Sequence, residues 1–262
     1  MNNKTFNILS VLCLIAVIGV MSWRDMHPKG GSASTVPMLS LTYFADSAIA
    51  SAQIPDDNIP VTIDQGEFKY TPDGKTLWAH QGMSPVTLAQ RQINLLLHFD
   101  GLPQDPAETL EKIQTLTDDW KHQGTGISLL VVYYHPQKPN LKAYTALIRA
   151  LHNRFKESFN IIAMGDTSWL EDPLKTGLEP LREYSPWFTI ALPHPAISPE
   201  LLSKLKKFPY SFTLQFPAGV LPADIDMATL KKIGLLEGGI LTLDPSKPLP
   251  KKEEKIGLFP KF

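Results

Sequence analysis

The stretch INLLLHFDG, residues 93–101, decides how the fold of this chain is interpreted. Its apolar run is typical of a strand in the middle of a sheet, but it ends in His98, Asp100 and Gly101. Polar groups cost free energy when they are buried without partners, so a core strand that ends in them opens onto a turn, a cavity or a site. The pattern on either side of this stretch indicates which of the three applies.

After residue 92, runs typical of strands alternate with runs typical of helices. The predicted strands lie at 93–99, 127–134, 160–166, 187–193, 210–216 and 239–244. The predicted helices lie between them, at 105–123, 140–158, 172–185, 198–208 and 223–234. Before residue 92 the pattern is less regular and predicts strands at 38–44, 61–70 and 76–82, with a hairpin turn at 71–75. This alternation implies a parallel sheet covered by helices, either a closed (β/α) barrel or an open doubly wound sheet.

Two observations favour the barrel. The strand at 93–99 has an apolar face, carrying Leu95 and Leu97, and a mixed face, carrying Asn94 and His98. A doubly wound sheet needs both faces apolar, whereas a barrel can turn a mixed face inward. In addition, no glycine-rich phosphate loop follows this strand, which disfavours the usual nucleotide-binding forms of the doubly wound sheet. We therefore predict an α/β fold of the (β/α) TIM-barrel-like class, irregular or incomplete because only six strands are strongly indicated.

The N-terminus carries an apolar segment at residues 8–21. We interpret residues 1–23 as a signal anchor or signal peptide, and favour the uncleaved anchor because small residues do not follow the segment at the usual distance. A buried core helix is the remaining alternative. Residues 24–36 are interpreted as a flexible linker and residues 37–262 as the barrel-like domain. The expected location is the cell membrane, single-pass, with the domain in the periplasm or extracellular space; secretion is the alternative.

Charge and cysteine content exclude several classes of function. The chain has 25 basic and 26 acidic side chains, with a formal net charge of −1, so we expect no nucleic-acid partner. Its single cysteine lies at position 13 and leaves no internal disulfide or thiolate zinc site for the domain. His98, His135 and His194 raise the alternative of a metal site, but no second local ligand motif accompanies them. We predict neither a metal nor a cofactor.

Polar side chains recur at the carboxyl ends of the predicted strands, where barrel enzymes carry their sites. Asp100 and Asp166 are the candidate catalytic pair, with Asp244 as a third acid. The candidate substrate-binding residues are His98, Tyr133, Tyr134, His135, Ser168, Trp169, His194 and Gln215. Paired carboxylates and aromatic rings around one mouth are typical of sugar binding and glycoside hydrolysis. The alternative is that each aspartate is a turn or cap residue and each aromatic ring is part of the core.

The run from NLLLHFDG to NIIAMGDTSWL resembles a family of uncharacterised bacterial exported proteins, a domain of unknown function related to glycoside-hydrolase barrels. The matching positions are Asp100, Gly101, Trp120, Gly124, Tyr144, Leu147, Arg149, Ser168, Trp169 and Leu170. Where the family's second strand ends in aspartates, this chain has Tyr133, Tyr134 and His135. The resemblance implies an exported barrel protein that binds carbohydrate with weak or lost catalysis, and the predicted anchor at residues 1–23 would tether it to the membrane. An active glycoside hydrolase on envelope or extracellular polysaccharide, using paired aspartates, is the alternative.

Overall fold

The computed structural model describes residues 39–46, 54, 59–71, 75–88, 92–136, 139–171, 177–217, 220 and 225–243. All of them belong to the compact unit Pro37–Phe262. The predicted anchor and linker, residues 1–23 and 24–36, lie outside the described residues. Within the described ranges, no helix is both long enough and apolar enough to cross a membrane.

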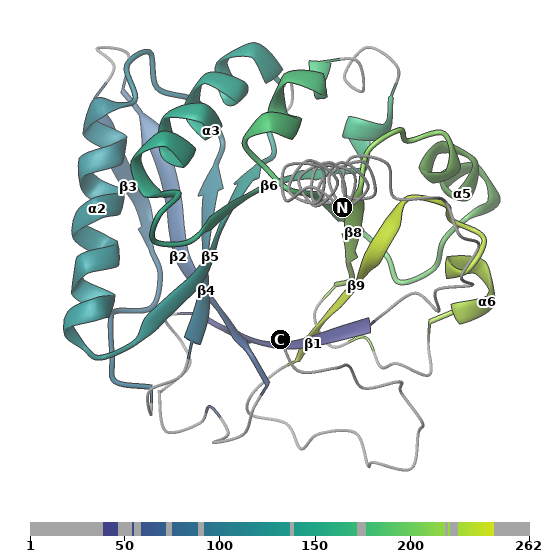
Figure 1. Cartoon of the computed structure of the whole chain (residues 1–262), viewed down its shortest axis with the longest axis horizontal. Helices are drawn as coiled ribbons and strands as arrows, with labels where there is room; N and C mark the ends of the chain where they lie inside the picture. The colour runs from purple at the N-terminus through teal and green to yellow at the C-terminus, as the bar shows by residue number, and fades with distance from the viewer. Residues whose placement is uncertain are drawn as a thin grey trace, which may run out of the picture. The chain divides into compact units, whose positions relative to one another are not determined.

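A ring of parallel strands forms the centre of the domain (Figure 1). Each strand pairs in parallel with its neighbours, and β1 pairs with β9 on one side and with β2 on the other, which closes the ring. Its members are β1 (Leu39–Ala45), β2 (Val61–Tyr70), β4 (Gln92–Phe99), β5 (Gly126–Tyr134), β6 (Asn160–Asp166), β7 (Phe188–Ala191), β8 (Phe212–Gln215) and β9 (Leu236–Leu243). The prediction of a TIM-barrel-like α/β fold is thus confirmed, and β1 and β2 supply the strands that the six strongest patterns lacked.

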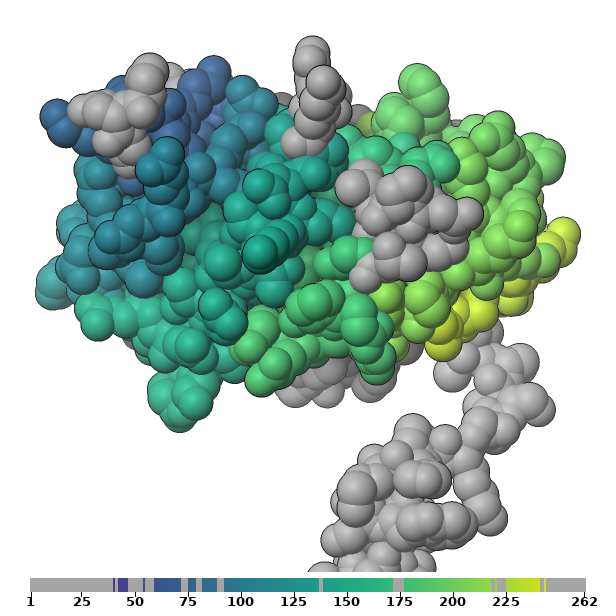
Figure 2. Space-filling model, turned by 90° about the horizontal axis from the view of Figure 1, so that it is seen from above, coloured from purple at the N-terminus to yellow at the C-terminus, as the bar shows by residue number. Residues whose placement is uncertain are grey.

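The helices lie outside the ring, as Figure 1 shows for α2 and α3. Their bounds are α2 (Ala107–His122), α3 (Leu141–Phe155), α5 (Pro199–Lys206) and α6 (Met227–Leu230), with 3-10 helices η2 (Thr167–Leu170) and η3 (Glu179–Glu183). In the space-filling view, α2 lies on the blue-teal side of the molecule and α5 on the green side (Figure 2). The prediction of one α-helix over 172–185 is wrong for Glu179–Glu183, which form the 3-10 helix η3, because Pro180 lies in the interior of the predicted helix and lacks the backbone donor that an α-helix needs there.

Local sequence explains where the two longest helices begin and end. The Asn140 side chain caps α3 by accepting a hydrogen bond of 3.1 Å from the Ala143 backbone N–H. After α2, Gly124 takes a φ of +75°, a left-handed conformation that glycine adopts without steric cost. The buried face of α3 consists of Leu141, Tyr144, Leu147, Ile148, Leu151 and Phe155. This face follows from the helical spacing of apolar residues in the sequence.

The main core lies between the ring and its helices. In β4, the outward side chains of Ile93, Leu95, Leu97 and Phe99 are fully buried in this core cluster. The inward Leu96 is also buried but lies outside that cluster, and Asn94 and His98 on the same face are only half-buried. The barrel therefore turns its mixed face inward, and its wall is held by apolar packing on the outside.

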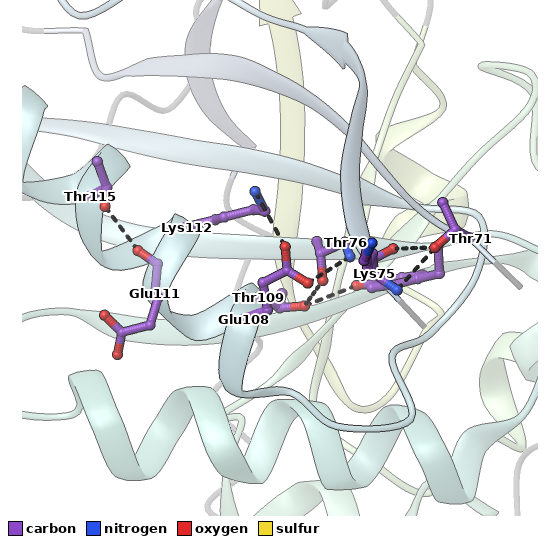
Figure 3. A network of polar contacts seen from close by, with 9 residues as sticks. Thr71, Lys75, Thr76, Glu108, Thr109, Glu111, Lys112 and Thr115 are labelled. Carbon is purple, nitrogen blue, oxygen red and sulfur yellow. Dashed lines mark hydrogen bonds and ion pairs between the residues drawn. The ribbon is translucent and has the colours of Figure 1, made fainter. Parts of the chain in front are cut away.

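The segment between β2 and β4 is the irregular part of the ring. In place of a helix it contains β3 (Thr76–Gln81), which pairs antiparallel with β2 and lies beside α2 (Figure 1). Polar contacts attach this hairpin to the start of α2 (Figure 3). The Thr76 N–H donates to Glu108 Oε2 at 2.9 Å, and the Thr76 and Thr109 hydroxyl groups are 3.1 Å apart. The Tyr70 hydroxyl lies 3.4 Å from that of Thr109.

Candidate functional site

A bulge in β2 brings two carboxylates to the inner face of the ring. Asp64 pairs with Leu96 of β4, whereas His98, two residues further along β4, pairs with Glu67, so β2 contains one extra residue. Gly66 takes a φ of +94° inside the bulge, and its N–H donates to Asp64 Oδ1 at 2.7 Å. Bulges re-aim side chains and are frequent beside active sites. Here the bulge directs both Asp64 and Glu67 toward His98.

The bulge is held from the outer side of the ring. The Gln65 side chain is 2% exposed; its Oε1 accepts from Trp120 Nε1 at 3.1 Å and its Nε2 donates to the Met83 carbonyl at 3.2 Å. The Met83 N–H donates to the Asp64 carbonyl at 3.0 Å. Gly82 lies so close that a Cβ at this position would be 1.9 Å from the Asp64 carbonyl oxygen. The position of the two acids therefore depends on α2 and on the segment after β3.

Three aromatic side chains from β4 and the end of β5 gather beside these acids. The ring centroids of His98 and Tyr133 are 5.5 Å apart, those of His98 and His135 are 5.8 Å apart, and those of Tyr133 and His135 are 4.7 Å apart. All three side chains are half-buried. His98 and Tyr133 are paired in register, which places them on the same face of the ring.

His98 is in close contact with Asp64. Its Nε2 atom lies 3.4 Å from Asp64 Oδ1. This atom is buried and has no hydrogen-bond partner among the described residues, because the contact with Asp64 has ion-pair distance without hydrogen-bond geometry. A buried polar atom without a partner is unfavourable, so a small rotation of the imidazole toward Asp64, or a donor or acceptor from a ligand, would stabilise this arrangement.

An open cavity of about 270 Å³ lies over these residues and is lined by Asp64, Gly66, Glu67, His98 and His135. This volume is slightly below the roughly 300–1,000 Å³ of usual small-molecule sites. At the rim, Lys69 Nζ lies 3.4 Å from Glu67 Oε2, and the lysine side chain is 53% exposed. Across the part of the chain that the structure describes, no three His, Cys, Asp or Glu side chains are placed to hold a metal ion.

Asp166 faces this site from β6. Burial raises the pKa of Tyr133, and the negative charge of Asp166 raises it further. Asp166 Oδ1 also accepts a hydrogen bond of 2.8 Å from the Ser168 N–H, which caps η2. Asp166 therefore both caps η2 and acts electrostatically on the candidate site.

Asp100, which follows the last residue of β4, lies apart from the cavity lining. It is exposed and is not one of the described residues that line the cavity. It acts electrostatically on Tyr134: burial is the main cause that raises the pKa of this phenol, the hydrogen bond from the Asn140 N–H lowers it, and the charge of Asp100 raises it. Among the described residues, Asp64 and Glu67 are thus the acids that line the cavity, whereas Asp100 and Asp166 of the predicted pair do not line it.

Two of the predicted substrate-binding rings belong to the core. Tyr134 is 3% exposed and stacks on Tyr144 at 4.9 Å, on the helix-facing side of β5. Trp169 is fully buried, and a Cβ on Gly165 would lie 1.9 Å from its Cε2 atom. Each ring is covered by other side chains, and neither is among the described residues that line the cavity.

The remaining predicted residues are distributed around the ring. Ser168 is half-buried in η2, and His194 is exposed in the loop after β7. Gln215 is half-buried at the end of β8, in the same register row as Ala191 and Asp166. Asp244 lies outside the described residues.

Asp64 and Glu67 were not among the site residues predicted from the sequence. The predicted strand at 61–70 contained a signal for them, because Gly66 interrupts an otherwise strand-like run between two acids. An isolated glycine in a strand pattern indicates a bulge or a close backbone approach. The direction in which the bulge turns the flanking acids is not encoded in that local pattern.

No family model matches this chain, and no curated protein sequence matches it. Among solved structures, the chain is similar to a crystal structure of 2,3-dimethylmalate lyase, a member of the PEP mutase/isocitrate lyase superfamily. The match has 13% sequence identity and a TM-score of 0.36, and covers 57% of this chain and 53% of that chain. The chain thus spans about half the length of that enzyme. The fold described above rests on the strand pairing and not on this similarity.

Proposed function

We propose that this barrel binds carbohydrate at the mouth formed by β2, β4 and β5. The observation that carries the proposal is the open cavity lined by Asp64, Glu67, His98 and His135. It lies at the carboxyl ends of parallel barrel strands, where barrel proteins carry their sites. The carbohydrate is an envelope or extracellular polysaccharide if residues 1–23 tether the protein to the membrane as the sequence predicts.

The chemistry of the lining suits a polyhydroxylated ligand. Ionised carboxylates only accept hydrogen bonds, so a ligand of Asp64 and Glu67 must bring O–H or N–H donors. Imidazole rings such as those of His98 and His135 offer nitrogens that can donate or accept hydrogen bonds, which matches the dual character of sugar hydroxyl groups. The half-buried ring of Tyr133 offers an apolar face beside them.

Glycoside hydrolysis is the second candidate function. Hydrolysis requires one carboxylic acid to protonate the leaving oxygen and a second carboxylate to act as base or nucleophile. The bulge in β2 directs two carboxylates, Asp64 and Glu67, to one cavity. In this function Asp64 and Glu67 take the catalytic roles predicted from the sequence for Asp100 and Asp166.

A glycan array probed with the full-length chain, followed by product analysis on each glycan that binds, tests both functions. Asp64→Asn and Glu67→Gln keep the shape of the side chain, and the amide oxygen that replaces Oδ1 of Asp64 can still accept the Gly66 hydrogen bond. Each is expected to weaken glycan binding about tenfold or more, because a hydrogen bond to a charged group contributes about 1.5–3 kcal/mol.

Glu157→Gln is the matched control, since Glu157 is exposed and lies between α3 and the start of β6, at the opposite end of the strands from the mouth. Binding without products supports carbohydrate binding alone, and products that disappear in Glu67→Gln support hydrolysis. If both mouth variants bind glycans as tightly as the control, the proposal is wrong.

A further inference from the structure

Carboxylates dominate the charge of the described mouth. Asp64 and Glu67 line the cavity, and Asp166 acts on Tyr133 from the neighbouring strand. Of the described basic side chains, Lys69 lies at the rim, where it pairs with Glu67 while remaining 53% exposed. Because Lys69 is long and largely in solvent, a cationic group of a ligand can replace it against Glu67 at small cost.

Aromatic rings lie directly beside these acids. Tyr133 and His135 pack at 4.7 Å with an interplanar angle of 41°, and His98 meets both rings edge-on. An ammonium group over an aromatic face is attracted by about 0.5–2 kcal/mol, more when it is desolvated. Carboxylates together with aromatic faces form the arrangement that recognises amines, whereas a carboxylate or phosphate of a ligand would be repelled here.

We propose that the carbohydrate bound at this mouth carries a protonated amine, so that the preferred ligand is a de-N-acetylated amino sugar. Its ammonium group donates to Glu67 and contacts the rings of Tyr133 and His135. Neighbouring hydroxyl groups of the sugar donate to Asp64. This inference rests on the proposed carbohydrate function and deepens it by naming the substrate class.

The test compares three β-1,4-linked trisaccharides that differ only at carbon 2. They are the glucosamine trimer, the N-acetylglucosamine trimer and cellotriose, which carry an amine, an acetamide and a hydroxyl group. Isothermal titration calorimetry on the full-length chain measures the affinity for each. The glucosamine trimer is expected to bind about tenfold more tightly than the two neutral trimers, with a preference that decreases as salt is raised.

Variants locate the origin of the preference. Glu67→Gln is expected to weaken the binding of all three trimers, but that of the glucosamine trimer most, so that the preference for the amine falls below about threefold. Glu111→Gln, on the exposed face of α2, is the matched control for general charge effects and is expected to keep the full preference.

The outcomes separate the two proposals. If neutral trimers bind as tightly as the glucosamine trimer, the amine inference is wrong and carbohydrate binding stands. If the preference survives in Glu67→Gln, the amine is recognised elsewhere and the inference is also wrong. If none of the three trimers binds and the glycan array is equally negative, both proposals are overturned.

Discussion

Strands β2 and β4 lie side by side and bring polar side chains to the same cavity by different means. In β4, regular alternation places Leu95 and Leu97 in the outer core and His98 inside. In β2, alternation is interrupted by the bulge, and only the extra residue allows both Asp64 and Glu67 to face inward. A regular strand positions its side chains by its own period of two, whereas a bulged strand needs partners elsewhere in the chain.

The two strands differ in how many other parts of the chain hold their polar side chains in place. His98 requires nothing beyond the pairing of β4 with β2 and β5. The bulge depends on Trp120 in α2 and on Gly82 and Met83 after β3. The positions of Asp64 and Glu67 therefore depend on more contacts than the position of His98 does. Mutations in the supporting residues should displace Asp64 and Glu67 while leaving β4 unchanged.

The largest effect is expected from Gly82→Ala. The new Cβ would overlap the Asp64 carbonyl oxygen at 1.9 Å, and neither backbone can move without breaking the hydrogen bond from Met83. Overpacking of this kind destabilises a protein by about 1–3 kcal/mol or more. We therefore expect the free energy of unfolding, measured in urea, to fall by about 3 kcal/mol and glycan binding to be lost.

Gly234→Ala is the control for this prediction, because no described atom beyond its own chain neighbours lies within 4 Å of its ideal Cβ. Its free energy of unfolding should remain within about 0.5 kcal/mol of that of the unmodified chain. If Gly82→Ala is equally harmless, the bulge does not require the close approach of this segment.

A smaller effect is expected from Trp120→Phe, which removes the donor to the buried Gln65 side chain and keeps a large ring. An unsatisfied buried acceptor costs about 1–3 kcal/mol. The same loss should lower glycan affinity, because Gln65 lies between Asp64 and Glu67. Unfolding in urea and calorimetry measure the two effects.

A double-mutant cycle with Gln65→Met checks that the effect passes through this hydrogen bond. The coupling free energy between the two positions should be about 1 kcal/mol. Simple additivity of the two substitutions would show that Trp120 stabilises the protein by packing alone.

The smallest effect is expected from Thr109→Val, which removes the fully buried hydroxyl group that joins the β2–β3 hairpin to α2. The free energy of unfolding, measured in urea, should fall by about 1 kcal/mol, which is the usual net contribution of one hydrogen bond. Thr115→Val on the exposed face of the same helix is the matched control, with an expected change of less than about 0.5 kcal/mol. Equal effects at both positions would show that the contacts of Thr109 with Thr76 and Tyr70 do not stabilise the attachment of the hairpin to α2.

Much of the fold could be predicted from local patterns. The predicted strand at 160–166 coincides with β6, and the apolar residues that recur at helical spacing in the predicted helix at 140–158 form the buried face of α3. Of the candidate site, His98, Tyr133 and His135 were predicted and are brought together. Tyr134 was placed in the same group, although strict alternation after Tyr133 already directs it to the opposite face.

Periodicity is a local property, so the amino-acid sequence alone determined the order of strands and helices, the mixed inner face of β4 and the class of the fold. Closure of the ring through β1, the burial of Trp169 and the entry of Asp64 and Glu67 into the cavity were decided only by the tertiary structure. Each of these depends on contacts between residues far apart in the chain, such as Gln65 with Trp120, and no window of sequence contains both partners.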